Sequence, residues 1–195
     1  SFGYELLGHF CDTPEGSVTT GGDCADDNPN VYPGNTAQVD GKDSDCDGRK
    51  DWKVTVVVAV DDAGEICINN EVIGSTGEWP SGEEYEVWLQ SGTHTVGIHG
   101  WDTGYVITAA IAHLEISDGS MWTTDSAWRY DPEPNQEGIG KQGWCGTGFD
   151  DSDWDFAQDI GPIGDPSNPW GDAPFNFPES SPAHWIWDHF PVELN

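Results

Sequence analysis

Basic residues are scarce in this sequence. Its 195 residues include six lysines and arginines against 36 aspartates and glutamates, so the formal net charge at pH 7 is −30. Nucleic acids and anionic membrane surfaces are bound largely through basic side chains, and this balance argues against both as partners. A chain of this charge attracts cations instead.

Long apolar runs and familiar catalytic motifs are also missing. No stretch approaches the roughly 20 apolar residues of a membrane-spanning helix, so we expect no membrane insertion. Residues 1–4 show no basic region followed by an apolar one, and we expect a secreted chain whose signal peptide has been removed. Neither G-x-S-x-G nor H-E-x-x-H occurs, and 36 acidic residues place carboxylate pairs together by chance. We therefore predict no enzymatic activity.

Methionine and long helix-forming stretches are rare as well. There is one methionine, whereas glycine numbers 25 and proline 13. Because glycine and proline favour turns over helix interiors, the composition indicates short strands joined by many turns. Eleven tryptophans, seven phenylalanines and five tyrosines supply apolar surface for a folded core despite the charge. We therefore predict an all-β fold.

Seven segments from residue 52 onward carry strand patterns. Residues 52–60 form a nearly continuous β-branched run, which predicts a central strand buried on both faces. A turn at Asp62–Glu65 leads to the second strand and a turn at Asn70–Glu71 to the third. The strands predicted after the first one are residues 66–69, 72–74, 85–89, 93–99, 105–116 and 184–190. Their spacing is typical of a β-sandwich.

We expect residues 1–195 to form a single β-sandwich domain with two elaborations. Residues 11–51 are rich in cysteine and aspartate and predict a loop excursion held by disulfides and a bound cation. Residues 129–183 hold most of the prolines and predict long ordered loops. The cysteines form no C-x-x-C pair, which favours disulfides and an oxidising, extracellular location. Their odd number leaves at least one without an intramolecular partner, and the pairing stays open among Cys11, Cys24, Cys46, Cys67 and Cys145.

Three segments resemble a known family. The run Val58–Gly74 looks like a strand, a D-D-x-G turn and two further strands, Gly148–Trp154 resembles an F-D-D-S-x-W motif, and Ala183–Trp187 resembles a closing strand. In this order, over about residues 52–190, they are similar to galactose-binding-like jelly rolls. The resemblance implies a jelly-roll β-sandwich that binds carbohydrate or serves as an appendage of a larger surface protein, often with a structural calcium. Asn70-Glu71 stands where the family has Asn-Gly.

An acidic loop precedes the first strong strand pattern. Asp43, Asp45 and Asp47 occupy positions 1, 3 and 5 of a D-x-D-x-D-G sequence, whose glycine permits the turn that brings the carboxylates together. The backbone carbonyl of Arg49 and the side chain of Asp51 stand at positions 7 and 9. This pattern predicts a Ca²⁺ site without the helices of an EF-hand, because position 12 carries valine in place of glutamate. The alternative is a solvated acidic turn.

Loop tryptophans are the candidates for carbohydrate contacts. A pyranose ring presents an apolar C–H face that stacks on an indole, while neighbouring polar side chains bind its hydroxyls. Residues His99, Trp101 and Asp102 lie beside glycines at a strand end, and Trp79 and Trp170 lie in other loops. We assign these five residues to a candidate binding site, with loop packing as the alternative for each tryptophan. We assign to core packing Trp52, Trp88, Trp154, Trp185 and Trp187.

These features predict a non-enzymatic extracellular module, stabilised by Ca²⁺, for adhesion at a cell surface or matrix. Its expected partner is a glycan or a surface or matrix protein. The alternative is a self-assembling subunit of an extracellular filament or surface layer, in which the odd cysteine and bridging cations join copies of the chain. Adaptation to a saline habitat would explain the acidic excess equally and says nothing about activity.

Overall fold

The computed structural model describes residues 22–25, 27–36, 38–77, 79–101, 108–131 and 143–188. Every regular element within these ranges is a β-strand, which confirms the predicted all-β fold. In the same ranges, no helix has the length and apolar character needed to cross a membrane. The chain divides into two compact units, a smaller one of Ser1–Val54, Trp88–Gly92 and Ile116–Asp118 and a larger one holding the remainder. The single domain over residues 1–195 stays a prediction.

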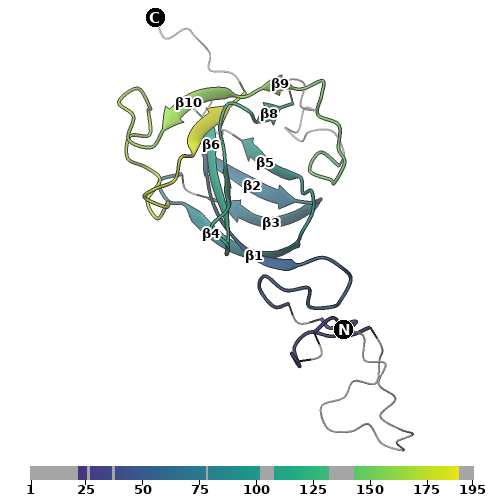
Figure 1. The fold of residues 1–195 in the computed structure, drawn as a ribbon. Coiled ribbons are helices and arrows are strands. Elements are labelled where there is room, and N and C mark those ends of the chain that lie inside the picture. Colours follow the sequence, from purple (N-terminus) through teal and green to yellow (C-terminus); the bar gives the residue numbers. More distant parts are fainter. Residues whose placement is uncertain are drawn as a thin grey trace, which may run out of the picture. The chain divides into compact units, whose positions relative to one another are not determined.

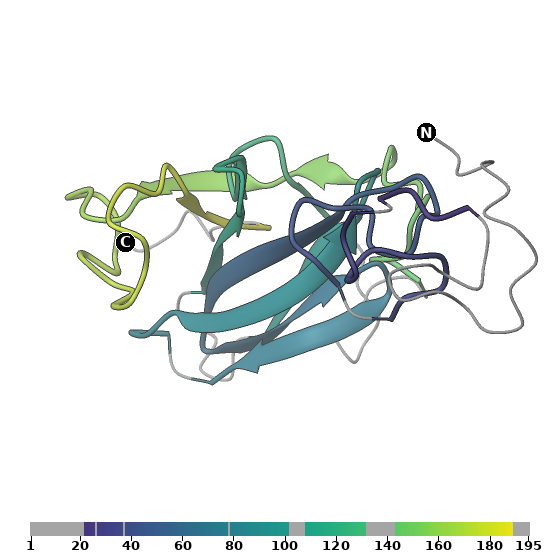
Figure 2. The ribbon, with the colours of Figure 1, turned by 60° about the horizontal axis from the view of Figure 1, so that its bottom comes forward.

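Two antiparallel sheets make up most of the regular structure (Figures 1 and 2). The first has the order β10-β11-β6-β1-β4, with β7 also paired to β6. Its strands are β1 (Asp51–Asp61), β4 (Glu83–Gln90), β6 (Ala109–Ile116), β7 (Met121–Thr123), β10 (Gln158–Pro162) and β11 (His184–Trp187). The second has the order β3-β2-β5. Its strands are β2 (Ala63–Ile68), β3 (Glu71–Thr76) and β5 (Val96–Trp101). A separate short ribbon joins β8 (Arg129–Tyr130) to β9 (Asp155–Phe156).

The two sheets of the larger unit face each other across an apolar core. Val56, Val58 and Val60 alternate along β1 and are each 0 % exposed, as expected of side chains on one face of a strand. Tyr85 of β4 reaches across to β3, where its hydroxyl donates to the carbonyl of Ser75 at 2.6 Å and accepts from the N–H of Ser75 at 3.1 Å. This arrangement confirms the predicted β-sandwich.

Loops cover the opposite face of the first sheet. Trp185 of β11, 0 % exposed, packs there in a cluster with Ala59, Ile111 and the loop residue Trp170. The rings of Trp170 and Trp185 stack with centroids 4.8 Å apart, and the indole Nε1 of Trp170 donates to the Asp61 carboxylate at 2.8 Å. Packing on this face thus orders part of the predicted long loops of residues 129–183. The same region contains β8, β9 and β10, which the sequence pattern did not predict.

Each predicted strand has a counterpart among the described residues, but some predicted limits are wrong. The predicted turn at Asp62–Glu65 is mostly strand, because residues 63–65 belong to β2 and pair with residues 99–101 of β5, which begins at Val96 and not at residue 93. The β-branched run of residues 52–60 lies in β1, and its later part is buried on both faces. The turn between β2 and β3 is formed by Asn69 and Asn70, with φ angles of 52° and 71°, and not by Asn70-Glu71 as predicted. Asparagine occupies this left-handed region more readily than glutamate, which explains the shift. Residues 105–107 and 189–190 of two predicted strands lie outside the described residues.

Two disulfides join four of the five cysteines. Cys24–Cys46 lies in the smaller unit, with Cα atoms 5.6 Å apart, and confirms the predicted stapling of residues 11–51. Cys67–Cys145 lies in the larger unit and links β2 to the loop before β9, with Cα atoms 6.2 Å apart. Cys11 lies outside the described residues.

Candidate ligand-binding pocket

A pocket of about 320 Å³ lies in the larger unit along β5, which is the edge strand of the second sheet. Its other walls come from Ala127–Asp131, from the loop around residues 144–157 and from the end of β11. The lining is rich in aromatic side chains, which are Trp128, Tyr130, Trp144, Phe149, Trp154 and Trp187. A concave, largely aromatic cavity of this size suits a small organic ligand.

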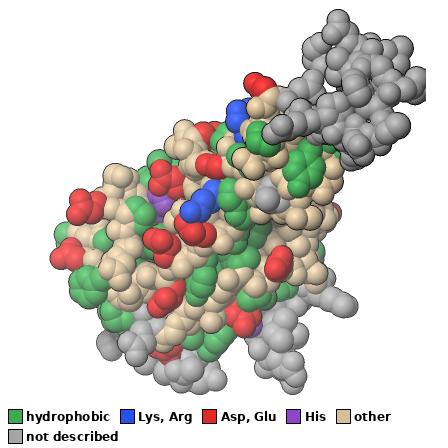
Figure 3. All heavy atoms as spheres, turned by 90° about the horizontal axis from the view of Figure 1, so that it is seen from below, with side chains coloured by type: hydrophobic (Ala, Val, Ile, Leu, Met, Phe, Trp, Pro, Cys, Tyr) green, Lys and Arg blue, Asp and Glu red, His purple; other side chains and the backbone are tan. Residues whose placement is uncertain are grey.

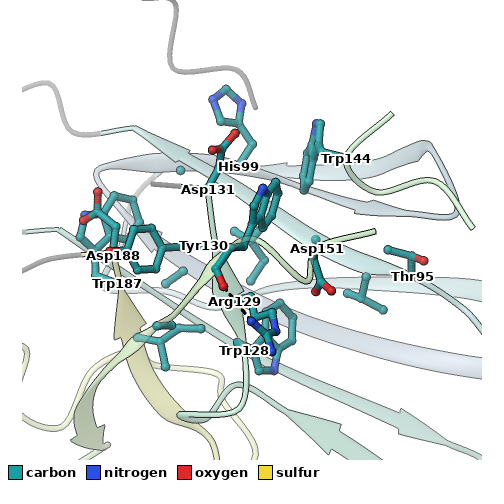
Figure 4. Close-up of a pocket in the computed structure, with 18 of the residues that line it drawn as sticks. Thr95, His99, Trp128, Arg129, Tyr130, Asp131, Trp144, Asp151, Trp187 and Asp188 are labelled. Carbon is teal, nitrogen blue, oxygen red and sulfur yellow. Dashed lines mark hydrogen bonds between the residues drawn. The ribbon is translucent and has the colours of Figure 1, made fainter. Parts of the chain in front are cut away.

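Two of the aromatic walls rest on glycines of β5. A Cβ added to Gly97 would overlap the ring of Trp144, and one added to Gly100 would lie 2.8 Å from the ring of Trp187. Glycine at these two positions therefore lets each indole lie directly on the strand backbone. The two tryptophans stand on opposite sides of the pocket, Trp144 near Asp151 and Trp187 near Asp188 (Figure 4).

The Cys67–Cys145 disulfide fixes the wall that carries Trp144. Cys67 pairs directly with Gly97 in the β2–β5 register, and Cys145 follows Trp144 in the chain. The N–H of Asn70 also donates to the carbonyl of Cys145 at 2.9 Å. A covalent bridge and a backbone hydrogen bond thus hold this loop against the second sheet.

Two residues of the pocket lining carry a buried ring nitrogen without a hydrogen-bond partner. Nε2 of His99 and Nε1 of Trp154 are buried, and neither has a hydrogen-bond partner within the part of the chain that the structure describes. Buried polar atoms are almost always satisfied by protein, water or ligand, so such atoms are informative where they gather. Both atoms are buried within the pocket wall and do not face its open part.

Most of the charge around the pocket is negative. Asp131, Asp151 and Asp188 line it. Among the described lining residues, Arg129 is the only lysine or arginine. Burial, followed by the carboxylates of Asp155 and Asp188, raises the pKa of Tyr130 above its usual value. The phenol therefore stays protonated at neutral pH and is able to donate a hydrogen bond.

The predicted acidic loop brings three of its carboxylates together. Oxygen atoms of Asp43, Asp45 and Asp47 lie within 4.8 Å of one another. The Asp43 carboxylate also accepts the backbone N–H groups of Asp47 at 3.0 Å and Gly48 at 2.9 Å, so it turns the loop as well. Such a group could hold a metal ion, and exposed acidic groups are also common without one.

Two other residues predicted for the metal site have different contacts. The guanidinium Nε of Arg49 lies 3.4 Å from the Asp47 carboxylate. Asp51, 3 % exposed, accepts the N–H of Ser44 at 3.2 Å and does not belong to the group of three carboxylates. Its carboxylate stabilises the base of the loop.

The predicted sugar-binding residues are dispersed in the structure. His99 lines the pocket, and the ring of Trp101, 39 % exposed, lies 5.3 Å from the His99 ring. Trp79 is partly buried against the cluster on the outer face of the first sheet, and Trp170 is 4 % exposed within that cluster. Asp102 lies outside the described residues.

Sequence reasoning missed most of the pocket wall. Trp154 and Trp187, assigned to packing alone, also line the pocket, and the sequence analysis did not single out Trp128, Tyr130 or Trp144. The clearest signal available was the run Trp128–Asp131, which places two aromatic and two charged residues together in a loop region. Nothing in the sequence indicated that this run lies beside β5.

No protein-family model matches the chain, and no curated protein matches it either. Among solved structures, the chain is similar to a lectin from Pleurotus ostreatus in complex with GalNAc, with a TM-score of 0.51 and 23 % identity. The match covers 64 % of this chain and 36 % of the lectin, so the chain corresponds to about a third of the lectin's length.

Two further structures give weaker similarity. The apo form of the same lectin has a TM-score of 0.49 at 24 % identity, covering 64 % of this chain and 36 % of the lectin. An α-L-rhamnosidase from Streptomyces avermitilis complexed with L-rhamnose has a TM-score of 0.48 at 20 % identity, covering 63 % of this chain and 13 % of the enzyme. The likeness to the GalNAc-bound lectin agrees with the predicted fold, a β-sandwich.

Proposed function

We propose that the pocket beside β5 binds a carbohydrate and that the chain is a non-enzymatic, extracellular glycan-binding module with a role in adhesion. The observation that carries this proposal is a pocket of about 320 Å³ whose lining includes six aromatic side chains, contributed by β5's neighbouring loops and by β11. Aromatic faces stack on the apolar side of a pyranose, and the Tyr130 hydroxyl and the carboxylates of the lining bind its hydroxyl groups.

Two further observations agree with this function. The lectin that shares the fold is complexed with GalNAc, and two disulfides suit an oxidising, extracellular location. Trp101 extends the proposed site, because its ring packs on His99 and remains 39 % exposed.

Replacing Trp144 tests the proposal. We expect Trp144→Ala to weaken glycan binding by at least about tenfold, because one stacking wall is lost. The measurement is titration calorimetry with a sugar first identified on a glycan array. The matched control is Trp122→Ala, since Trp122 is 57 % exposed on β7 and does not line the pocket. Unchanged affinity in a folded Trp144→Ala variant, or no glycan bound by the original chain, would refute the proposal.

We further propose that the loop containing Asp43, Asp45 and Asp47 binds Ca²⁺, with the Arg49 carbonyl as a further expected ligand and with Asp51 contributing through the base of the loop, where its carboxylate accepts the N–H of Ser44. The proposal rests on the convergence of the three carboxylates within 4.8 Å. Calcium prefers six to eight oxygen ligands, so waters would complete the shell around a site of this kind.

A calcium titration decides between the ion site and a solvated acidic turn. We expect saturable binding by calorimetry and a higher unfolding temperature in Ca²⁺ than in chelator at equal ionic strength. Asp45→Asn removes one charge, so it should weaken Ca²⁺ binding at least about tenfold. In the original chain the Asp45 carboxylate accepts the N–H of Asp47 at 3.3 Å, and the asparagine keeps an oxygen that can accept the same N–H, so the loop should stay folded. The control is Asp150→Asn, whose residue accepts the N–H of Ser152 at a separate corner. Equal Ca²⁺ affinity in Asp45→Asn and the original chain would exclude the site.

A further inference from the structure

We propose that the carbohydrate taken by this pocket carries a protonated amino group, as an unacetylated hexosamine unit does. This inference rests on the proposed glycan-binding function and adds the chemical class of the sugar. It is carried by the charge balance of the described lining, which holds three carboxylates and one arginine, and by walls of aromatic rings.

The arginine of the pocket lining is held in place by contacts with uncharged groups. Nη1 of Arg129 donates to the backbone carbonyl of Trp154 at 2.7 Å, and its Cζ lies 4.3 Å from the centroid of the Phe156 ring. The register of the short ribbon explains this position, because Arg129 pairs with Phe156 across β8 and β9. These contacts fix the position of the guanidinium, and the three carboxylates of the lining outnumber its charge.

The carboxylates stand on more than one side of the pocket. Asp151 lies on the same side as Trp144, whereas Asp188 lies with Tyr130 on the opposite side (Figure 4). The raised pKa of Tyr130 agrees with a negative potential there, since the carboxylates of Asp155 and Asp188 contribute to it. A cation held between the two sides is attracted from both, and a uronic or sialic acid is repelled from both.

The aromatic walls suit the same ligand. An ammonium group over the face of a tryptophan or tyrosine is attracted by the ring quadrupole, and this attraction grows when water is excluded. The C–H face of the same sugar stacks on a neighbouring ring. An aminosugar therefore uses the rings and the carboxylates together, whereas its N-acetylated counterpart keeps only the stacking.

The whole chain favours the approach of such a ligand. The net charge of −30 attracts cations at long range, and Figure 3 shows acidic side chains spread over the face in view with few basic ones among them. The same charge attracts any polycation without specificity, so the test has to separate the pocket from the surface.

The experiment compares a glucosamine tetramer with its fully N-acetylated counterpart by titration calorimetry on the full chain at 0.15 M salt. We expect the tetramer with free amines to bind at least about tenfold more tightly. In Asp151→Asn this preference should shrink several-fold while binding of the acetylated tetramer stays unchanged. Asp118→Asn, which removes a charge in the smaller unit outside the pocket lining, should keep the full preference.

Other outcomes overturn the inference in distinguishable ways. Equal or tighter binding of the acetylated tetramer refutes the amino preference and leaves carbohydrate binding intact. Binding of the amino tetramer that persists at full strength in Trp144→Ala shows attraction to the acidic surface and refutes the assignment to this pocket. If neither tetramer binds and no glycan on an array does, the proposed function fails together with the inference.

Discussion

The double variant Cys67→Ala/Cys145→Ala is expected to lose about 4.5 kcal/mol of stability and to lose ligand binding at the pocket. The bridge closes a sequence separation of 78 residues, and the loop-entropy relation gives this magnitude for a cross-link of that length. Binding should fall as well, because the bridge holds the loop of Trp144 against Gly97, the glycine paired with Cys67. Urea unfolding of the variant and glycan titration measure the two effects.

The second disulfide supplies the control. Cys24→Ala/Cys46→Ala opens a separation of 22 residues in the smaller unit, for which the same relation gives about 3.4 kcal/mol. Glycan binding should survive there, since none of the residues that line the pocket belongs to the smaller unit. The role given to Cys67–Cys145 would be wrong if both double variants bound the glycan as tightly as the original chain.

The strands were predictable because their signals are local. The β-branched run of residues 52–60 has one structural solution, a buried strand, and the structure has β1 there. The turn at Asn69 and Asn70 was displaced by one residue, since two neighbouring asparagines both tolerate positive φ and only the β2–β3 register selects the pair. Local chemistry thus indicated a hairpin, and tertiary pairing set its position.

The pocket was not predictable because its walls come from distant parts of the chain. In the sequence, Gly97 and Gly100 indicate only a less stable strand. In the structure, each accommodates an indole from a segment more than 40 residues away. His99 was chosen for its neighbours in sequence, and its place in the pocket follows from the β5 edge. The filament alternative and the fate of the odd cysteine stay predictions.

The burial of loop tryptophans was also not predictable from the sequence. Trp170 stands between prolines and glycines in a loop, a setting that suggests exposure, yet it is 4 % exposed. A loop that folds over a sheet buries its aromatic residue as a strand does, and the sequence does not tell which loop covers which face. Trp170 is buried because its ring stacks on that of Trp185, with the two ring centroids 4.8 Å apart.

Trp185→Ala is therefore expected to destabilise the larger unit by about 3–5 kcal/mol, the usual range for removing a fully buried large aromatic side chain. The residue is 0 % exposed, and its loss leaves Trp170 without its stacking partner on the outer face of the first sheet. Urea or thermal unfolding gives the change in stability. Trp122→Ala is the matched surface control, and because Trp122 is 57 % exposed its change should stay within about 0.5 kcal/mol.

A milder substitution separates ring packing from the indole N–H. Nε1 of Trp185 is buried and has no hydrogen-bond partner within the described residues, so Trp185→Phe keeps an aromatic ring and removes a group that gains nothing from folding. We expect Trp185→Phe to be clearly more stable than Trp185→Ala. A loss of less than about 1 kcal/mol in Trp185→Ala would mean that the loop of Trp170 is held by other contacts. In that case Trp170 would again be a candidate for ligand contact, since its ring would be free to leave the cluster.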